Sequence, residues 1–213
     1  MRFLLNRIIA PFIFYPFLKL FNRLEIIGID NIPETGAVVI VANHISMWDA
    51  VILYCAIKRR VCFMAKEELF RVPVIGYAIS KIDAFPVKRD TIDRNALRIA
   101  ARILEEGRIL GIFPEGHRSM GGAMREFKNG AALFAHRSKS TVIPVLFENT
   151  DKAFPKTFKS KIRMTIGPPI DMSAFYERKA NQTLMESMTK SFLTAIKSLA
   201  GADTGVSATG DDK

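Results

Sequence analysis

The sequence predicts a single α/β domain in which helices flank a central mixed sheet, with an additional helical segment at the N-terminus. Two observations lead to this prediction. Short β-branched runs alternate with helical patterns through the middle of the chain, and the first 23 residues have a separate, apolar and basic composition. A length of 213 residues suits one domain, and 49% apolar with 24% charged residues excludes a disordered or collagen-like chain.

The N-terminal segment, residues 1–23, contains 15 apolar residues, four basic residues and no acidic residue. Its longest uncharged run, Ile8–Leu18, has 11 residues and contains Pro11 and Pro16, whereas a membrane-spanning helix needs about 20 residues. No small-residue cleavage site of a signal peptide follows this run. We therefore expect one or two short helices lying in a membrane interface, with Arg and Lys at the lipid headgroups. The alternative is a cap that packs on the domain's own core.

Seven short β-branched runs predict the strands of the sheet. In chain order they are Leu24–Gly28, Ala37–Ala42, Val61–Ala65, Ile82–Val87, Ile109–Phe113, Thr141–Phe147 and Ile162–Ile166. Helical patterns lie between several of these runs, which is the arrangement typical of an α/β domain.

Two helices are indicated by apolar stripes of helical period. The first is Asp93–Glu106, which Gly107 ends. The second opens at Thr183 and Glu186, which have the spacing of a capping box. Its apolar face consists of Leu184, Met188, Phe192, Ala195, Ile196 and Leu199. Residues 201–213 are small and polar and predict a solvated tail, so the domain itself is expected over residues 24–200.

The charge of the chain favours anionic partners. It has 31 Lys and Arg against 21 Asp and Glu, a formal net charge of +10, so nucleic acid, an anionic lipid surface and a phosphate-bearing substrate are candidates. Lys58–Arg60, and the alternating Lys159, Lys161 and Arg163, are either headgroup contacts or ordinary solubilising charges. Two cysteines without a CxxC pair and three separated histidines argue against a disulfide scaffold and a metal site.

The first chemistry-bearing stretch follows the run Ala37–Ala42, where Asn43 and His44 come directly after a buried strand. Asp49 lies five residues after His44, and on one continuous helix the two would not share a face. The spacing therefore predicts a loop, with His44 at the strand end and Asp49 near the next helix start. An imidazole takes a proton near neutral pH, and a carboxylate on its other nitrogen stabilises the resulting imidazolium. The alternative is a loop His with an N-cap Asp before a helix at Ala50–Ala56.

The second stretch, Gly111–Ser119, also runs from a strand into polar residues, with Pro114 and Gly116 shaping a turn. Glu115 has a carboxylate that accepts a hydrogen bond from a substrate hydroxyl, and Arg118 has the fork geometry that suits a phosphate. The alternative is a turn that holds a structural ion pair.

Two further strand ends carry weaker signals. Ala84–Asp90 ends in two cations, Lys88 and Arg89, which are either phosphate ligands or a solvated surface charge run. Val142–Val145 reads by composition as a buried strand that contains a proline.

Taken in order, Asn43-His44-x4-Asp49, Phe85–Arg89, Phe113–Gly116 and Val142–Val145 resemble the four motifs of one family. That family is the glycerophospholipid acyltransferases, specifically the bacterial-type 1-acyl-glycerol-3-phosphate acyltransferases with an HxxxxD motif. Two departures from its pattern are present. His117 stands where the family commonly has Thr, and Lys88 precedes Arg89 where a single Arg is usual.

The resemblance implies a single acyltransferase domain. The implied reaction moves a fatty acyl group from acyl-CoA or acyl carrier protein to the free hydroxyl of lysophosphatidate, giving phosphatidate for phospholipid synthesis. His44 is then the general base, and Asp49 holds it. The implied substrate-binding residues are Lys88, Arg89, Glu115, Gly116, Arg118 and Ser119, with Arg89 favoured for the phosphate. No cofactor, metal or protein nucleophile is implied, because the thioester co-substrate is already activated.

The implied partners are a lysophospholipid acceptor, an acyl thioester donor and an anionic membrane surface, with acyl carrier protein as a further candidate. The expected location is the cytoplasmic face of the inner cell membrane, with a peripheral or monotopic attachment. Glycerol 3-phosphate and other lysolipids are alternative acceptors. A nucleic-acid binder is disfavoured, because Phe154 and Phe158 with their neighbouring lysines form no recognition motif. A non-catalytic membrane binder has no use for both His44 and Asp49.

Overall fold

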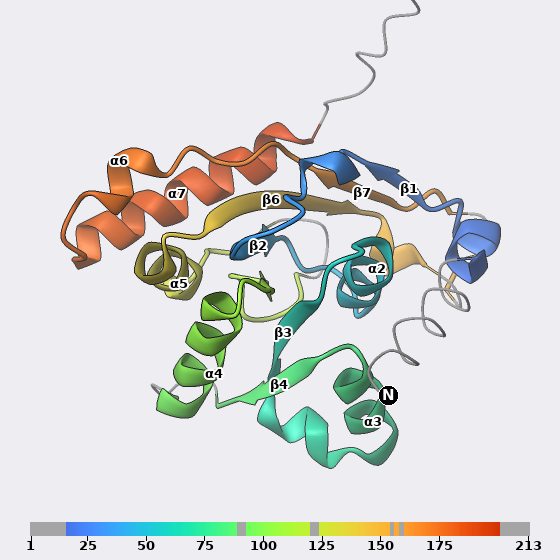
Figure 1. Ribbon diagram of the computed structural model, residues 1–213. Helices are drawn as coiled ribbons and strands as arrows, with labels where there is room; N and C mark the ends of the chain where they lie inside the picture. The colour runs from blue at the N-terminus through green and yellow to red at the C-terminus, as the bar shows by residue number, and fades with distance from the viewer. Residues whose placement is uncertain (1–15, 89–92, 120–123, 154–155, 158–159, 201–213) are drawn as a thin grey trace, which may run out of the picture.

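The computed structural model describes residues 16–88, 93–119, 124–153, 156–157 and 160–200. These residues form a seven-stranded sheet in the order β1-β7-β6-β2-β5-β3-β4, with helices on both faces (Figure 1). All neighbouring strands pair in parallel except β6 and β7, which are antiparallel. The predicted α/β domain with a mixed central sheet is therefore confirmed.

Every β-branched run of the sequence overlaps an observed strand, although β3 and β6 each extend one residue beyond their runs. The strands are β1 (Glu25–Ile27), β2 (Val38–Ala42), β3 (Val61–Lys66), β4 (Ala84–Val87), β5 (Ile109–Ile112), β6 (Thr141–Glu148) and β7 (Arg163–Ile166). The largest difference is at β4, which begins two residues later than its run. Asp83 explains the delay, because its positive φ of 56° interrupts the extended backbone.

The connections between the strands are mostly helical. The α-helices are α2 (Trp48–Ala56), α3 (Pro73–Lys81), α4 (Arg94–Glu105), α5 (Gly130–Ser138), α6 (Ser173–Tyr176) and α7 (Gln182–Ser198). Short 3-10 turns form η1 (Ile29–Asn31), η2 (Glu67–Arg71) and η3 (Thr150–Lys152). Residues 16–22 are also helical.

The two helices expected from apolar stripes are both present, but one of their starts differs. Asp93 caps α4 by accepting hydrogen bonds from the N–H groups of Asn95 and Ala96. For α7 the predicted capping box is wrong. Asn181 is the cap, since its side chain accepts from the Leu184 N–H, so Thr183 lies inside the helix.

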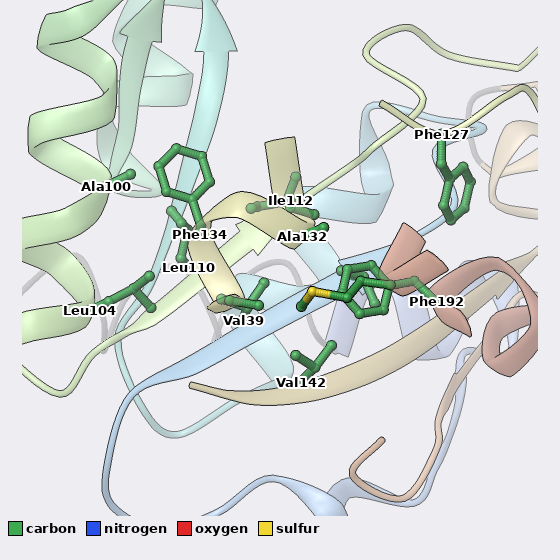
Figure 2. Close-up of a cluster of buried hydrophobic side chains, with 14 of the residues drawn as sticks. Val39, Ala100, Leu104, Leu110, Ile112, Phe127, Ala132, Phe134, Val142 and Phe192 are labelled. Carbon is green, nitrogen blue, oxygen red and sulfur yellow. The ribbon is translucent and has the colours of Figure 1, made fainter. Parts of the chain in front are cut away.

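The core has two layers, one on each face of the sheet, and β2 contributes to both. Val39 points into the layer beneath α4, α5 and α7 (Figure 2). Val41 belongs to the same layer, while Val38 and Ile40 belong to the layer that contains α2. All five residues of β2 are buried because helices cover both faces, which explains why its sequence is a continuous apolar run.

The N-terminal segment is described only from residue 16 onward. Leu18 is fully buried in the core layer that faces α2, and the Asn22 side chain donates a hydrogen bond to the Ser160 hydroxyl at 3.0 Å. Residues 16–22 thus pack on the domain, as the alternative of a cap proposes. The rest of the predicted membrane-interface segment, and the predicted tail at 201–213, lie outside the described residues. No helix among the described residues is both long enough and apolar enough to cross a membrane.

The strand register gathers the carboxyl ends of the parallel strands at one edge of the sheet. Val41 pairs with Ile112, Phe63 pairs with Gly111, and Lys66 pairs with Val87. The loops that follow β2, β3, β4 and β5 therefore leave the sheet on the same side, which is where α/β proteins place their sites.

The cations of Lys58–Arg60 lie at the opposite edge, just before β3 begins. Arg59 donates to the carbonyl oxygens of Pro33 at 2.6 Å and Gly107 at 2.7 Å, and Arg60 pairs with Asp83 at 2.7 Å. Both side chains hold loops of the domain together, a function that neither sequence-based alternative described.

The packing of α7 against the sheet predicts a large stability effect at Phe192, which is fully buried. Phe192→Ala is expected to lower the free energy of unfolding by about 3–5 kcal/mol, because the truncation leaves a cavity. Urea denaturation measures the change. Thr194→Ala, at an exposed position of the same helix, is the control and should change it by less than about 0.5 kcal/mol. Equal stability of the two variants would contradict the buried position of the ring.

Candidate active site

His44 and Asp49 meet at the carboxyl end of β2. His44 lies in the loop two residues after the strand, and Asp49 lies in the first turn of α2. The His44 Nδ1 and the Asp49 Oδ2 are 2.8 Å apart. A carboxylate only accepts hydrogen bonds, so Nδ1 carries the proton and Nε2 is left as the basic nitrogen. The loop predicted from the five-residue spacing is confirmed.

The Asp49 carboxylate is fully buried and receives hydrogen bonds on both oxygens. Oδ2 also accepts from the N–H groups of Ile45 and Ser46, each at 2.8 Å, and Oδ1 accepts from the hydroxyl of Thr150. The N-terminus of α2 adds a favourable dipole. Asp49 is not the N-cap of a helix at Ala50–Ala56, because α2 already begins at Trp48.

The loop of the Glu115 stretch holds the backbone of His44 on both sides. The His44 N–H donates to the Glu115 Oε1 at 2.9 Å, and the His44 carbonyl accepts from the Ser119 N–H at 2.7 Å. The imidazole stacks on the Phe113 ring, with centroids 4.2 Å apart and planes 22° apart. The side chain of His44 is 19% exposed, so the ring is fixed and one edge still reaches solvent.

Glu115 is buried, and its carboxylate accepts hydrogen bonds from two backbone N–H groups and one side-chain hydroxyl. Besides the His44 N–H on Oε1, its Oε2 accepts from the Ser119 hydroxyl and from the Arg125 N–H. These partners are neutral, so they are not the structural ion pair of the sequence-based alternative. The contacts give Glu115 and Ser119 a positioning role toward His44, whereas their contact with substrate stays a prediction.

Gly116 closes a tight turn between these residues. Its φ of 70° lies in the left-handed region, and its N–H donates to the Phe113 carbonyl at 3.0 Å. A side chain at this position would strain the backbone, which gives the turn a physical need for glycine.

The predicted phosphate ligands lie at the same edge of the sheet. Arg118 is exposed in the loop after β5, and Lys88 is exposed directly after β4. β3 separates these two strands, which places their ends about 10 Å apart. Arg89 lies outside the described residues, so the choice between Lys88 and Arg89 stays a prediction.

Phe147 of β6 and Thr150 in the turn after it contact the segment that carries His44 and Asp49. The Asn43 side chain donates to the Phe147 carbonyl at 2.9 Å and accepts from the Phe147 N–H at 2.7 Å, which extends the pairing of β2 with β6. Thr150 is fully buried in η3 and donates to Asp49. Thr150 carries no local signal in the sequence, because it is a lone Thr 101 residues from Asp49.

The family follows from comparison with known proteins. Residues 23–148 match the family described as Acyltransferase. The chain belongs to the acyltransferase family. The residues that build the His44 site come from the stretches Asn43–Asp49 and Phe113–Gly116, which resemble the first and third motifs of the family.

Several relatives of this acyltransferase share one name. A Bacillus subtilis protein named 1-acyl-sn-glycerol-3-phosphate acyltransferase is 29% identical, over 85% of this chain and 90% of its own length. A Borreliella burgdorferi protein of the same name is 30% identical, over 82% of this chain and 73% of its own length. The crystal structure of the 1-acyl-sn-glycerophosphate acyltransferase PlsC from Thermotoga maritima superimposes with a TM-score of 0.70 at 25% identity, covering 93% of this chain and 78% of that one. The resemblance stated from the motifs is confirmed.

The cysteines of this acyltransferase are not set up as nucleophiles. Both Cys55 and Cys62 are free thiols. Burial raises the pKa of the Cys55 thiol to about 12, and burial also raises the pKa of the Cys62 thiol. Both thiols are therefore protonated at neutral pH. Among the described residues, no group of three or more His, Cys, Asp or Glu side chains is arranged to hold a metal ion.

The hydroxyl of Thr150 is expected to position the acyltransferase dyad through Asp49. Thr150→Val keeps the volume and removes the donor, and a hydrogen bond to a charged group contributes about 1.5–3 kcal/mol. We expect kcat to fall about ten-fold or more with little change in KM for either substrate. Thr150→Ser should restore kcat. If the Val variant is folded and keeps the wild-type kcat, the hydroxyl has no part in positioning the dyad.

Replacement of Glu115 by Gln separates its positioning role from a substrate contact. The amide of Gln puts N–H donors where the structure needs an acceptor, so Glu115→Gln should cost about 1–3 kcal/mol of unfolding free energy and lower kcat. Glu126→Gln, at an exposed position of the same loop, is the matched control. Unchanged stability with a raised KM for the acceptor would instead identify Glu115 as a substrate ligand.

Proposed function

We propose that this acyltransferase transfers a fatty acyl group from an acyl thioester, acyl-CoA or acyl carrier protein, to the free hydroxyl of lysophosphatidate. The observation that carries the proposal is the bond between the His44 Nδ1 and the buried Asp49, which leaves Nε2 as a base at a partly exposed position. The names of the relatives from Bacillus subtilis and Borreliella burgdorferi support this acceptor.

The chemical step needs one base and no covalent enzyme intermediate. The His44 Nε2 takes the proton of the acceptor hydroxyl as the oxygen attacks the thioester carbonyl. The tetrahedral oxyanion then collapses, the carbon–sulfur bond breaks, and the imidazolium returns the proton to the leaving thiolate. The products are phosphatidate and a free thiol. Asp49 stabilises the imidazolium between these two transfers.

The cations at the same edge of the sheet bind the acceptor phosphate in this proposal. Arg89 is the favoured ligand, with Lys88 beside it and Arg118 on the neighbouring loop. The turn at Gly116 and the Ser119 backbone keep this loop against His44. Positioning of the hydroxyl near Nε2 is expected to contribute more than any single contact, because two bound reactants react as one molecule.

The proposed location is the cytoplasmic face of the cell membrane, as a peripheral or monotopic protein on an anionic surface. Its support is the net charge of +10 and the apolar, basic composition of residues 1–23. A soluble thioester and a lipid acceptor have to meet at such a surface. Acyl carrier protein is proposed as a partner only in its role as donor.

The proposal is tested by assaying the purified full chain with both thioester donors. Lysophosphatidate, glycerol 3-phosphate and lysophosphatidylcholine are supplied as competing acceptors. Wild type should form phosphatidate preferentially, and His44→Ala should lower kcat/KM by about 10²–10⁴-fold, the usual contribution of a general base. His136→Ala, a histidine on α5 bonded to the Arg178 carbonyl, is the matched control.

Each other outcome removes a stated part of the proposal. Preference for glycerol 3-phosphate or another lysolipid would leave the base in place and replace the acceptor. Equal activity of wild type and a folded His44→Ala variant would contradict the mechanism itself.

A further inference from the structure

The segment after β3 exposes apolar side chains instead of burying them. η2 and α3 present Leu69, Val72, Val74 and Tyr77 to solvent, and Val74 and Tyr77 are 80% and 66% exposed. In α3 only Gly76 is buried, whereas α4 and α7 bury stripes of apolar residues against the sheet. These four side chains, which we name the η2–α3 apolar surface, are not buried by the part of the chain that the structure describes.

The backbone beneath this surface is tightly packed. The Gly76 N–H donates to the Val72 carbonyl at 2.6 Å, and a Cβ on Gly76 would lie 2.4 Å from the carbonyl oxygen of Phe70. Only glycine permits this approach of α3 to η2. The apolar surface is therefore carried by a fixed helical hairpin and not by a loose loop.

The hairpin leaves the sheet at the edge that carries the dyad. β3 ends at Lys66, and η2 follows immediately, beside the edge strand β4 (Figure 1). The Phe63 ring of β3 stacks on Phe113 with centroids 6.3 Å apart, and Phe113 in turn stacks on the His44 ring. β3, the strand from which the hairpin leaves the sheet, is thereby connected to the His44 ring through Phe63 and Phe113.

Charged residues around the apolar surface are positive in sum. Lys66 pairs with Glu68 at 3.2 Å and Arg71 pairs with Glu67 at 3.1 Å, so these four charges cancel. Among the described residues Lys81 remains in excess, and its Nζ lies 4.7 Å from the centre of the Tyr77 ring. A lysine beside an amphipathic aromatic ring at the rim of an apolar surface is typical of groups that lie at the headgroup level of a membrane.

We propose that the η2–α3 apolar surface inserts into the outer part of an anionic lipid leaflet and holds the active-site edge against it. This inference rests on the proposed function, which places a lipid acceptor at that edge. The local charge excess is small, so burial of apolar side chains supplies most of the attraction. That balance favours a lipid leaflet over an acidic protein such as acyl carrier protein, whose recognition needs a larger unpaired basic area.

Binding of the full chain to vesicles tests the proposal. The vesicles contain phosphatidylglycerol with phosphatidylethanolamine, and flotation measures the bound fraction. Val74→Glu combined with Tyr77→Glu should weaken binding at least ten-fold. Thr183→Glu combined with Thr194→Glu, at exposed positions of α7, makes the same charge change elsewhere and should shift binding by less than two-fold.

Two further readouts separate docking from catalysis and from folding. Activity on a short-chain lysophosphatidate that dissolves as monomers should be equal in wild type and the Val74/Tyr77 double variant, while activity on vesicle-borne acceptor falls with binding. Val74→Trp should show a larger blue shift of its emission on addition of anionic vesicles than the wild type, whose one tryptophan is Trp48, and Thr194→Trp should show no such increase.

Three outcomes would overturn the docking surface. They are unchanged vesicle binding by the Val74/Tyr77 double variant, an emission shift of Val74→Trp no larger than that of the wild type, and intact vesicle binding with lost affinity for acyl carrier protein. If wild type transfers no acyl group to any acceptor while the vesicle results hold, the docking surface stands and the proposed function falls.

Discussion

A buried carboxylate has to be matched by hydrogen-bond donors, because removal of its charge from water costs several kcal/mol or more. Asp49 meets this constraint with four donors: the His44 ring, the N–H groups of Ile45 and Ser46, and the Thr150 hydroxyl. The donors come from the loop after β2 and from the turn after β6. The same bonds that make burial of the charge tolerable also fix the imidazole. Stability and the proposed chemistry of the site therefore depend on one set of contacts.

Patterns that are local in the chain made much of the fold and half of the site predictable. Seven β-branched runs marked the strands, most clearly β2, which helices bury on both faces, and the apolar stripe of Asp93–Glu106 marked α4. The loop that joins His44 to Asp49 followed from helix geometry alone. The resemblance to acyltransferases rested on motifs that are each a few residues long.

The remaining features depend on contacts between distant segments, which a single sequence does not reveal. Thr150 reaches Asp49 only because β6 lies beside β2 in the sheet. Glu115 looked like a substrate ligand, yet its neighbours in space are the His44 and Arg125 backbones. Asn181 replaced Thr183 as the cap of α7, since several polar residues precede that helix and the backbone conformation decides among them. The exposed face of α3 was likewise invisible, because an apolar residue in a sequence is expected to be buried.

The pairing of β1 with β7 has a consequence for how the protein matures. Among the described strands, β1 pairs only with β7, which comes last in chain order, and the Asp49 carboxylate accepts a hydrogen bond from Thr150, 101 residues downstream. A ribosome builds the chain from the N-terminus at about 5–20 residues per second, so the early strands wait several seconds for their partners. Long-range pairings of this kind slow the search for the native topology. The nascent chain therefore carries His44 and Asp49 for some time before the hydrogen bonds around the Asp49 carboxylate are complete.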